Sequence, residues 1–206
     1  MTAPRIDLIG LVGRKGSGKD TAATGLTTRG WQRAAVATPL RNVVKTMFLL
    51  DDNHCDIPEL KEKPGPLGVS YRRGMQVVGT EMVRRQLNIH LPELGHEGFW
   101  IQHMRRRIEH ARKTNVRIVI TDVRFRDEAD AILAMGGKLI HVQRAGVDVS
   151  DNHASETGVD DIVEGLAPPV LTNDGTPAQL QAGLQELVED MEAEQWDQGR
   201  MELMHD

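Results

Sequence analysis

The feature that most constrains this chain is a glycine-rich stretch, Gly13–Thr21, which directly follows the apolar run Ile6–Val12. Its three glycines permit turns with positive φ, and such turns direct successive backbone N–H groups into one concavity. A helix that begins near Lys19 adds the positive end of its dipole at the same place. The sequence therefore predicts a strand–loop–helix unit whose loop holds an anion.

The stretch follows the pattern G-x-x-x-x-G-K-[ST] except at the last position. Lys19, which we expect to be exposed in the loop, would reach the β- and γ-phosphates of a nucleoside triphosphate. Asp20 replaces the serine or threonine, so a carboxylate takes the place that usually meets Mg²⁺, and the Thr21 hydroxyl follows it. A glycine-rich turn without a ligand and a dinucleotide-binding loop are weaker alternatives. The predicted phosphate-binding residues are Gly13, Arg14, Lys15, Gly16, Ser17, Gly18, Lys19, Asp20 and Thr21.

Length and cysteine content point to one intracellular domain. A chain of 206 residues can bury a full core as a single domain. Its single cysteine, Cys55, permits no internal disulfide. Because no apolar run approaches the length of a membrane span, we expect a cytoplasmic protein that does not bind membranes.

The charge is unevenly distributed. The formal net charge is −5, but the segment from Glu186 onward carries −7, which leaves a mildly basic body. Such a body suits a small anionic substrate better than a long nucleic acid, which requires a broad basic face. We therefore expect no stable nucleic-acid binding, and the oligomeric state, including a homodimer, stays open.

Hydrophobic periodicity and turn residues predict alternating strands and helices. Strands are expected near 6–12, 31–38, 116–120, 138–143 and 170–172, and helices near 19–29, 39–48, 71–88, 98–113, 127–135 and from 177 onward. The polar segments 51–70 and 144–160 are expected to be irregular. The alternation favours an α/β fold with three layers, α/β/α, around a doubly wound parallel sheet whose ligands bind at the carboxyl ends of the strands.

Asp122 and Arg124 follow the buried strand at 116–120 and should lie at the edge of the sheet that holds the glycine-rich loop. A carboxylate there can hold Mg²⁺ or accept a proton, and an arginine two residues later can clamp a phosphate. A surface Asp–Arg pair that only starts the next helix is the alternative.

Further basic residues precede this strand. Arg41 and Lys45 are four residues apart on one predicted helix face, where they could bind an acceptor phosphate together. Arg72 and Arg84 bracket the next predicted helix and are candidates for the same role. An ordinary solvated helix face is an equally good reading of the first pair.

Two later segments could close the site. The polar segment from Arg144 to about Gly158, with His153 in it, is expected to be a mobile lid that brings the Arg144 charge to the phosphates. With one cysteine and scattered histidines, a zinc site at His153 is a poor alternative. Asn173 and Gly175 follow the last strand and either read the adenine edge or only form a turn.

These segments together resemble the bacteriophage deoxynucleoside monophosphate kinase family, within the P-loop nucleotide kinases. The resemblance is collinear over about 165 residues and includes the Gly-Lys-Asp-Thr form of the loop. It rests on Gly13–Thr21, Pro39–Arg41, Gln76–Glu81, Ile120–Arg124, Ala134–Gly137, His141–Arg144, His153–Glu156 and Leu171–Gly175.

The resemblance implies a P-loop kinase that transfers the γ-phosphoryl of ATP, with Mg²⁺, to a deoxynucleoside monophosphate (dNMP), in the host cytoplasm if the chain is encoded by a phage. It implies an acceptor-binding insertion at about 40–90, a lid at about 144–160 and an acidic helix at about 177–206. The expected catalytic residues are Lys19, Asp122, Arg124 and Arg144. The expected metal ligands are Asp20, Thr21 and Asp122, and the expected acceptor-binding residues are Arg41, Lys45, Arg72, Arg84 and Arg124.

Three alternative functions are also compatible with a loop of this kind. A kinase of the phosphomevalonate type shares the Gly-Lys-Asp pattern and also phosphorylates a phosphate monoester. A kinase of hydroxymethylated bases in DNA would require a basic groove for the strand. A regulatory module would use ATP only as a switch, without turning it over in response to a dNMP.

Overall fold

The computed structural model describes residues 5–95, 97–146 and 154–203. Contacts within the chain divide it into two compact units. The first, Met1–Ala34 with Arg107–Asp206, is called the sheet unit, and the second, Ala35–Arg106, is called the helical unit.

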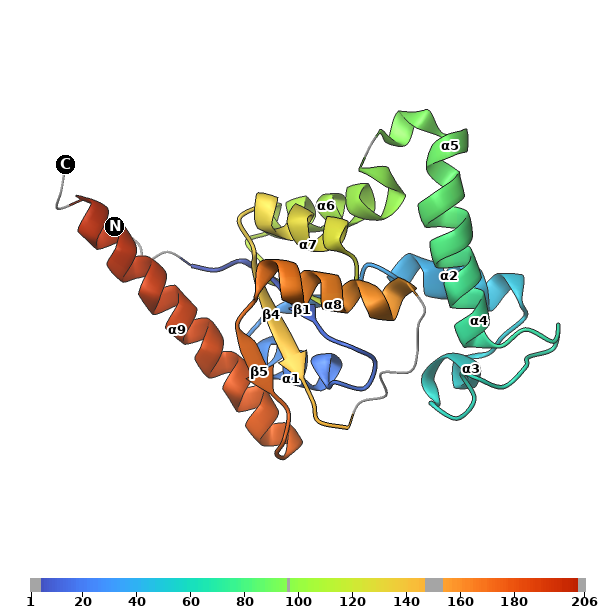
Figure 1. The fold of residues 1–206 in the computed structure, drawn as a ribbon, viewed down its shortest axis with the longest axis horizontal. Coiled ribbons are helices and arrows are strands. Elements are labelled where there is room, and N and C mark those ends of the chain that lie inside the picture. Colours follow the sequence, from blue (N-terminus) through green and yellow to red (C-terminus); the bar gives the residue numbers. More distant parts are fainter. Residues whose placement is uncertain (1–4, 96, 147–153, 204–206) are drawn as a thin grey trace. The chain divides into compact units, whose positions relative to one another are not determined.

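The sheet unit is built on five parallel strands in the order β2-β3-β1-β4-β5 (Figure 1). The strands are β1 (Leu8–Val12), β2 (Gln32–Ala34), β3 (Ile118–Val123), β4 (Lys138–Gln143) and β5 (Val170–Thr172). This arrangement confirms the predicted parallel α/β sheet.

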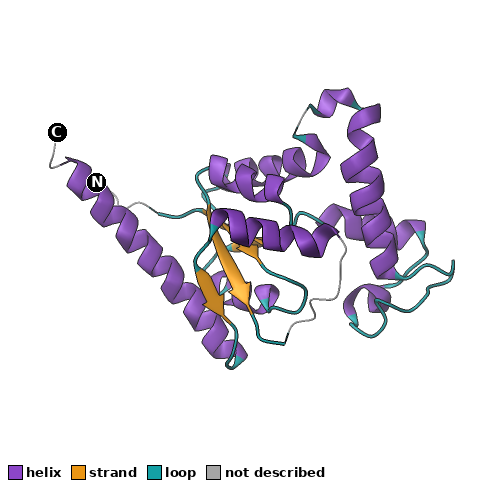
Figure 2. Cartoon of the chain, viewed as in Figure 1, coloured by secondary structure: helices purple, strands orange, loops and turns teal. Residues whose placement is uncertain are grey.

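Helices cover both faces of this sheet (Figure 2), so the unit has three layers. Helices α1 (Lys19–Thr27) and α9 (Pro177–Leu203) pack against each other on one face. Helices α7 (Arg126–Ala134) and α8 (Ala154–Leu166) pack on the other face. A capping box starts α9, because Gln179 Oε1 accepts from the Thr176 N–H at 2.8 Å and Thr176 Oγ1 accepts from the Gln179 N–H at 3.3 Å.

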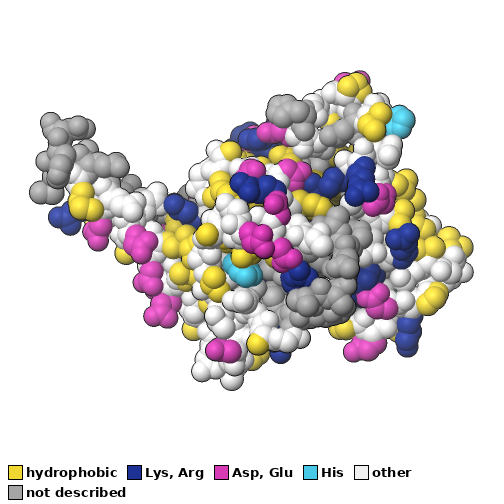
Figure 3. Space-filling model, viewed as in Figure 1, with side chains coloured by type: hydrophobic (Ala, Val, Ile, Leu, Met, Phe, Trp, Pro, Cys, Tyr) yellow, Lys and Arg dark blue, Asp and Glu magenta, His cyan; other side chains and the backbone are white. Residues whose placement is uncertain are grey.

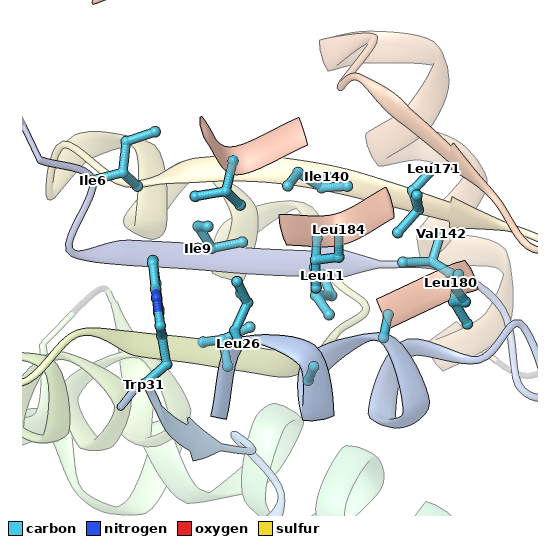
Figure 4. Close-up of a cluster of buried hydrophobic side chains, with 14 residues drawn as sticks. Ile6, Ile9, Leu11, Leu26, Trp31, Ile140, Val142, Leu171, Leu180 and Leu184 are labelled. Atoms are coloured by element: carbon cyan, nitrogen blue, oxygen red, sulfur yellow. The ribbon is translucent and has the colours of Figure 1, made fainter. Parts of the chain in front are cut away.

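The central strand β1 is fully buried, as its apolar sequence predicts. A main cluster of the core lies between this strand, its neighbours and helices α1 and α9 (Figure 4). On the opposite face, a Cβ at Gly10 would come within 2.8 Å of Ile132 and 2.9 Å of Leu139. The absence of a side chain at Gly10 therefore lets α7 pack directly on the strand that leads into the loop.

The helical unit contains α2 (Thr38–Met47), α3 (Asp52–Asp56), α4 (Tyr71–Gln76), the π-helix η1 (Val77–Leu87), α5 (Asn88–His90) and the 3₁₀ turn η2 (Pro92–Leu94). Helix α6 (Gly98–Lys113) contributes residues 98–106 to it. In its core the Trp100 Nε1–H donates to the carbonyl of Gly79 at 3.0 Å. Residues 77–87 lie within the helix predicted near 71–88 and are π-helical. The tertiary hydrogen bond from Trp100 satisfies one of their carbonyls.

Four expectations for local structure are corrected by the structure. Residues 52–56 of the predicted loop form α3, because the Asp51 side chain accepts the His54 N–H and caps the helix. Residues 154–160 begin α8, whose Val159 and Ile162 are buried in the core. The strand expected near 31–38 is limited to 32–34, and the one expected near 116–120 extends to Val123.

Within the described residues, no helix combines the length and the apolar character that a membrane span requires.

Candidate functional site

Strand register gathers the predicted site at the carboxyl edge of the sheet. In the parallel pairings Val12 lies beside Val123 of β3 on one side and beside His141 of β4 on the other. The loop that leaves Val12 is therefore flanked by Asp122 and Arg124, which lie on either side of Val123 in the sequence. The two segments expected to share an edge do so.

The loop itself, Gly13–Gly18, depends on its glycines. Gly16 and Gly18 have φ of 80° and 99°, a region that residues with side chains rarely adopt. A Cβ at Gly13 would lie 2.6 Å from the Val142 carbonyl oxygen and 2.7 Å from Ser17 Oγ. Helix α1 follows immediately, with Gly18 as its N-cap residue. The loop thus presents backbone N–H groups at a helix N-terminus, the arrangement that binds phosphate.

Lys19 is buried, with 7% of its surface exposed, and it is the first residue of α1. Its ammonium group donates to the carbonyls of Gly13 and Arg14 and to Ser17 Oγ at 3.4 Å. The expectation that Lys19 is exposed in the loop is therefore wrong. The loop folds over the lysine and holds its charge at the concavity.

Asn173, which follows β5, contacts the loop from the side of the sheet. Its side-chain Nδ2–H donates to the carbonyl of Ser17 at 2.9 Å. Neighbouring Gly175 is exposed, and a Cβ there would lie 2.6 Å from Gln179 Oε1. The structure thus shows a contact between Asn173 and the glycine-rich loop, which neither of the two interpretations from the sequence included.

Helix α8 contacts the loop on the other face. The Arg14 guanidinium donates to both carboxylate oxygens of Asp160, with Nε at 3.2 Å from Oδ1. His141 is half-buried nearby, and burial together with the positive charge of Lys19 lowers its pKa from the usual 6.5, while Asp160 opposes the shift. The ion pair between Arg14 and Asp160 links the loop to α8.

The turn after β3 is held at two points. Glu128 is 3% exposed, and its Oε2 accepts from the Arg124 N–H at 2.9 Å and the Phe125 N–H at 3.2 Å. A Cβ at Gly158 of α8 would lie 2.4 Å from the Arg124 carbonyl oxygen, so α8 packs against the same turn. These contacts hold the backbone at Arg124 and Phe125, at the start of α7.

Asp20 lies in the first turn of α1 and is exposed. Its Oδ1 is 3.5 Å from a guanidinium nitrogen of Arg33, on β2. Thr21 is half-buried beside it. Among the residues that the structure describes, no three His, Cys, Asp or Glu side chains converge on a metal site.

Two comparisons with known proteins identify the family. A family model described as deoxynucleotide monophosphate kinase matches residues 67–184, more than half of the chain. A protein of Acanthamoeba polyphaga mimivirus named putative deoxynucleotide monophosphate kinase is 40% identical over 155 residues, which cover 72% of this chain and 80% of that protein. This chain belongs to the deoxynucleotide monophosphate kinase family. It is accordingly a nucleotide kinase, a phosphotransferase.

Other matches are shorter or more distant. A deoxynucleotide monophosphate kinase of Escherichia phage RB69 is 37% identical over 70 residues, 34% of this kinase and 28% of that protein. Among solved structures, dephospho-CoA kinase from Campylobacter jejuni aligns with a TM-score of 0.48 and 12% identity, covering 91% of this chain and 98% of that chain. TT1252 from Thermus thermophilus aligns with a TM-score of 0.44 and 16% identity, with the same coverage.

The family match and the phosphate loop are separate observations. The matched range begins at residue 67, after the loop has ended. It includes the ends of β3, β4 and β5, which lie at the edge of the sheet beside the loop. The matched range and the glycine-rich loop therefore meet at the same edge of the sheet.

In the helical unit, the predicted acceptor-binding residues are paired with acidic side chains. Arg41 on α2 forms two hydrogen bonds to Asp56 on α3, at 2.8 and 2.9 Å. Lys45 contacts Asp52 at 2.6 Å. Arg41 lowers the pKa of the Asp56 carboxyl, and Asp56 raises that of the guanidinium. The two basic residues thus already bind carboxylates, which resemble phosphate in charge and in oxygen ligands.

Two further arginines lie in the same unit. Arg72 on α4 likewise pairs with an acidic side chain, that of Glu62, and Arg84 is half-buried in the π-helix η1. Arg144, just after β4, is exposed. In the segment expected to form a lid after it, residues 147–153, including His153, lie outside the described residues, and residues from Ala154 onward belong to α8.

Sequence reasoning missed two acidic residues. Asp160 was not identified as a site residue, because the sequence predicted an irregular lid at 144–160, where α8 begins. Glu128 escaped because the residue three positions earlier, Phe125, lacks the hydroxyl of a capping box, although a glutamate in the first turn of a helix is itself a capping signal.

Proposed function

We propose that this kinase transfers the γ-phosphoryl group of ATP to the 5′-phosphate of a dNMP, which yields ADP and the deoxynucleoside diphosphate. The observation that carries the proposal is the glycine loop that closes around Lys19 at the end of β1, in a chain of this family. A phosphate loop supplies the donor side of the reaction, and the family name supplies the acceptor class.

In the transfer, an oxygen of the acceptor phosphate forms a bond to the γ-phosphorus, and the bond from that phosphorus to the β,γ-bridging oxygen breaks. The acceptor oxygen is already ionised near neutral pH, so no strong base is required. The protein must align the two phosphates and stabilise the charge spread over the transferred group. Lys19, the loop N–H groups and Arg124 are the groups that we assign to this task.

Mg²⁺ fits the residues at this edge. A magnesium ion in a kinase uses one or two protein carboxylates and takes its other ligands from phosphates and water, so a dedicated cage is not required. Asp20, the Thr21 hydroxyl and Asp122 are oxygen ligands of the required kind and are our candidates for holding it. When bound, the ion neutralises developing charge on the phosphates.

The acceptor is assigned to the basic residues of the helical unit. Arg41 and Lys45 already bind carboxylates, and we expect the dNMP phosphate to take the place of those carboxylates. Arg72, Arg84 and Arg144 are proposed as further cationic groups for the phosphates.

A coupled assay for ADP formation tests this function across the four dNMPs, the four ribonucleoside monophosphates and phosphomevalonate. We expect turnover that requires a dNMP and Mg²⁺. Lys19→Met should lower kcat by about 10²–10³, since it removes a single electrostatic stabiliser. Transfer to phosphomevalonate alone, or ATP hydrolysis indifferent to every acceptor, would contradict the proposal.

A further inference from the structure

We infer that Asn173 is a positioning residue that directs the Gly18 N–H toward the phosphates of the bound nucleotide. The inference rests on the proposed function of the loop, and it gives Asn173 a role other than contact with adenine. It is carried by one hydrogen bond, the geometry of one peptide and one close approach.

The hydrogen bond starts from a rigid part of the sheet. Asn173 donates from Nδ2 to the Ser17 carbonyl at 2.9 Å. Its own backbone N–H donates to the Gln143 carbonyl at 2.7 Å, which continues the pairing of β5 with β4. A side chain supported in this way can hold a loop in one orientation.

The geometry of the peptide between Ser17 and Gly18 relates the bound carbonyl to the direction of the Gly18 N–H. The peptide bond between Ser17 and Gly18 is planar and trans, so its C=O and N–H point in opposite directions. Because Asn173 binds the carbonyl, the Gly18 N–H points away from Asn173. Gly18 is the N-cap residue of α1, at the helix end where backbone N–H groups bind anions.

Close contact between the two residues supports the assignment. A Cβ at Gly18 would lie 2.5 Å from Asn173 Nδ2, so the amide sits directly against the loop backbone. Ser17 is 2% exposed, which keeps water from replacing this donor. To read a base edge with the same N–H, Asn173 would have to release the Ser17 carbonyl.

The first test compares three ligands by calorimetry: ATP, GTP and inorganic tripolyphosphate, which has no base. Asn173→Ala and the near-isosteric Asn173→Asp, which lacks the donor, should weaken all three by similar factors of about 5 to 10. Asp174→Ala, an exposed change in the same loop, is the control and should leave the three affinities unchanged. Selective loss of ATP binding, with tripolyphosphate unaffected, would show that Asn173 reads the base and would overturn the inference.

The second test uses the protein without nucleotide. The amide ¹H and ¹⁵N resonances of Gly18 should shift in Asn173→Ala and Asn173→Asp but not in Asp174→Ala, while the thermal midpoints show that each variant is folded. Unchanged Gly18 resonances in both Asn173 variants would overturn the inference. A wild-type protein that binds none of the three ligands would instead contradict the proposed function, and the Gly18 resonances would still decide whether Asn173 orients the loop.

Discussion

His141 shows how the environment of a single residue can make the stability of the protein depend on pH. Its Nδ1 is buried and has no hydrogen-bond partner among the described residues. Burial and the nearby Lys19 charge favour the neutral ring, and the neighbouring Asp160 only partly offsets them. The folded protein therefore resists protonation of this histidine more than the unfolded chain does.

The sign of the resulting pH dependence follows from linkage. Between the lowered pKa of folded His141 and the usual value of about 6.5, the unfolded chain binds more protons, so stability falls as the pH decreases. We expect wild type to lose more stability between pH 7.5 and 5.5 than His141→Gln does. Urea denaturation at several pH values measures the difference.

His110, an exposed histidine on α6, provides the control. His110→Gln should retain the wild-type pH dependence. Equal slopes for wild type and His141→Gln would mean that His141 titrates alike in the folded and unfolded states.

At the residue level, the backbone of the glycine-rich loop was predictable, and the surroundings of its side chains were not. The glycine spacing predicted the loop and the helix after it, because positive φ and a following helix are local properties. The partners of Arg14 and Asn173 depend on Asp160 of α8 and on the end of β5. Such contacts across more than a hundred positions leave no periodic pattern in one sequence.

The connection from β3 to α7 is an element whose geometry depends on one buried carboxylate. Glu128→Ala should destabilise the protein by about 1–3 kcal/mol, because the Arg124 and Phe125 N–H groups lose their acceptor. It should also lower kcat through the displaced Arg124. Urea denaturation and the coupled assay measure the two effects.

Asp130→Asn is the matched control on the same helix. Asp130 is exposed and pairs with Arg126 four residues away, an interaction worth about 0.3–0.5 kcal/mol. Glu128→Gln keeps an oxygen acceptor and should recover part of the activity. If Glu128→Ala and Asp130→Asn behave alike, Glu128 does not position the turn.

Helices α2 and α3 form a second element with a testable consequence. If Asp56 competes with the acceptor for Arg41, Asp56→Asn should lower KM for the dNMP several-fold and leave KM for ATP unchanged. Steady-state kinetics with each substrate varied in turn measure this.

The control is Glu59→Gln, an exposed change shortly after α3. Arg41→Ala should raise KM for the dNMP. A similar rise in Asp56→Asn would mean that the ion pair orients Arg41 and that no competition occurs.

At the level of elements, long periodic helices and buried strands were predictable, and short or capped ones were not. The helix at 98–113 and the strand at 138–143 match their predicted bounds, because their apolar spacing is regular. Helix α3 depends on the Asp51 cap, and α8 on burial of Val159 and Ile162 beneath a polar surface. Figure 3 shows acidic and basic side chains interspersed over this face of the molecule. The irregular segment was expected at 144–160 because of its polar composition, which concealed the buried residues of α8.

In the sheet unit, helix α1 near the beginning of the chain closely approaches helix α9 at its end. A Cβ at Gly25 of α1 would lie 2.5 Å from the Gln181 carbonyl oxygen of α9. Alanine favours a helix over glycine by about 1 kcal/mol, but here it would push apart two helix backbones. We therefore expect Gly25→Ala to destabilise the protein by about 1–3 kcal/mol in urea denaturation.

Gly183→Ala is the comparison, because the nearest atom there is the end of the Leu171 side chain, at 3.1 Å. That side chain can move, so this change should be neutral or stabilising. A stabilised Gly25→Ala variant would show that α1 and α9 separate at little cost.

The fold class was predictable because alternating strands and helices admit few arrangements. The strand order β2-β3-β1-β4-β5 was not, since nothing local tells β3 to insert between β1 and β2. The boundaries of the helical unit, Ala35–Arg106, could not be predicted from composition either.

That strand order has a consequence for synthesis on the ribosome. The sheet neighbours of β1 are β3 and β4, and β2 pairs with β3, so a nascent chain that ends before residue 118 contains no pair of adjacent strands. The apolar strand β1 must then wait, unpaired and prone to aggregation, while the whole helical unit is translated. Since α9 packs against α1, the support of the helix that follows the glycine-rich loop is completed only when the last helix emerges.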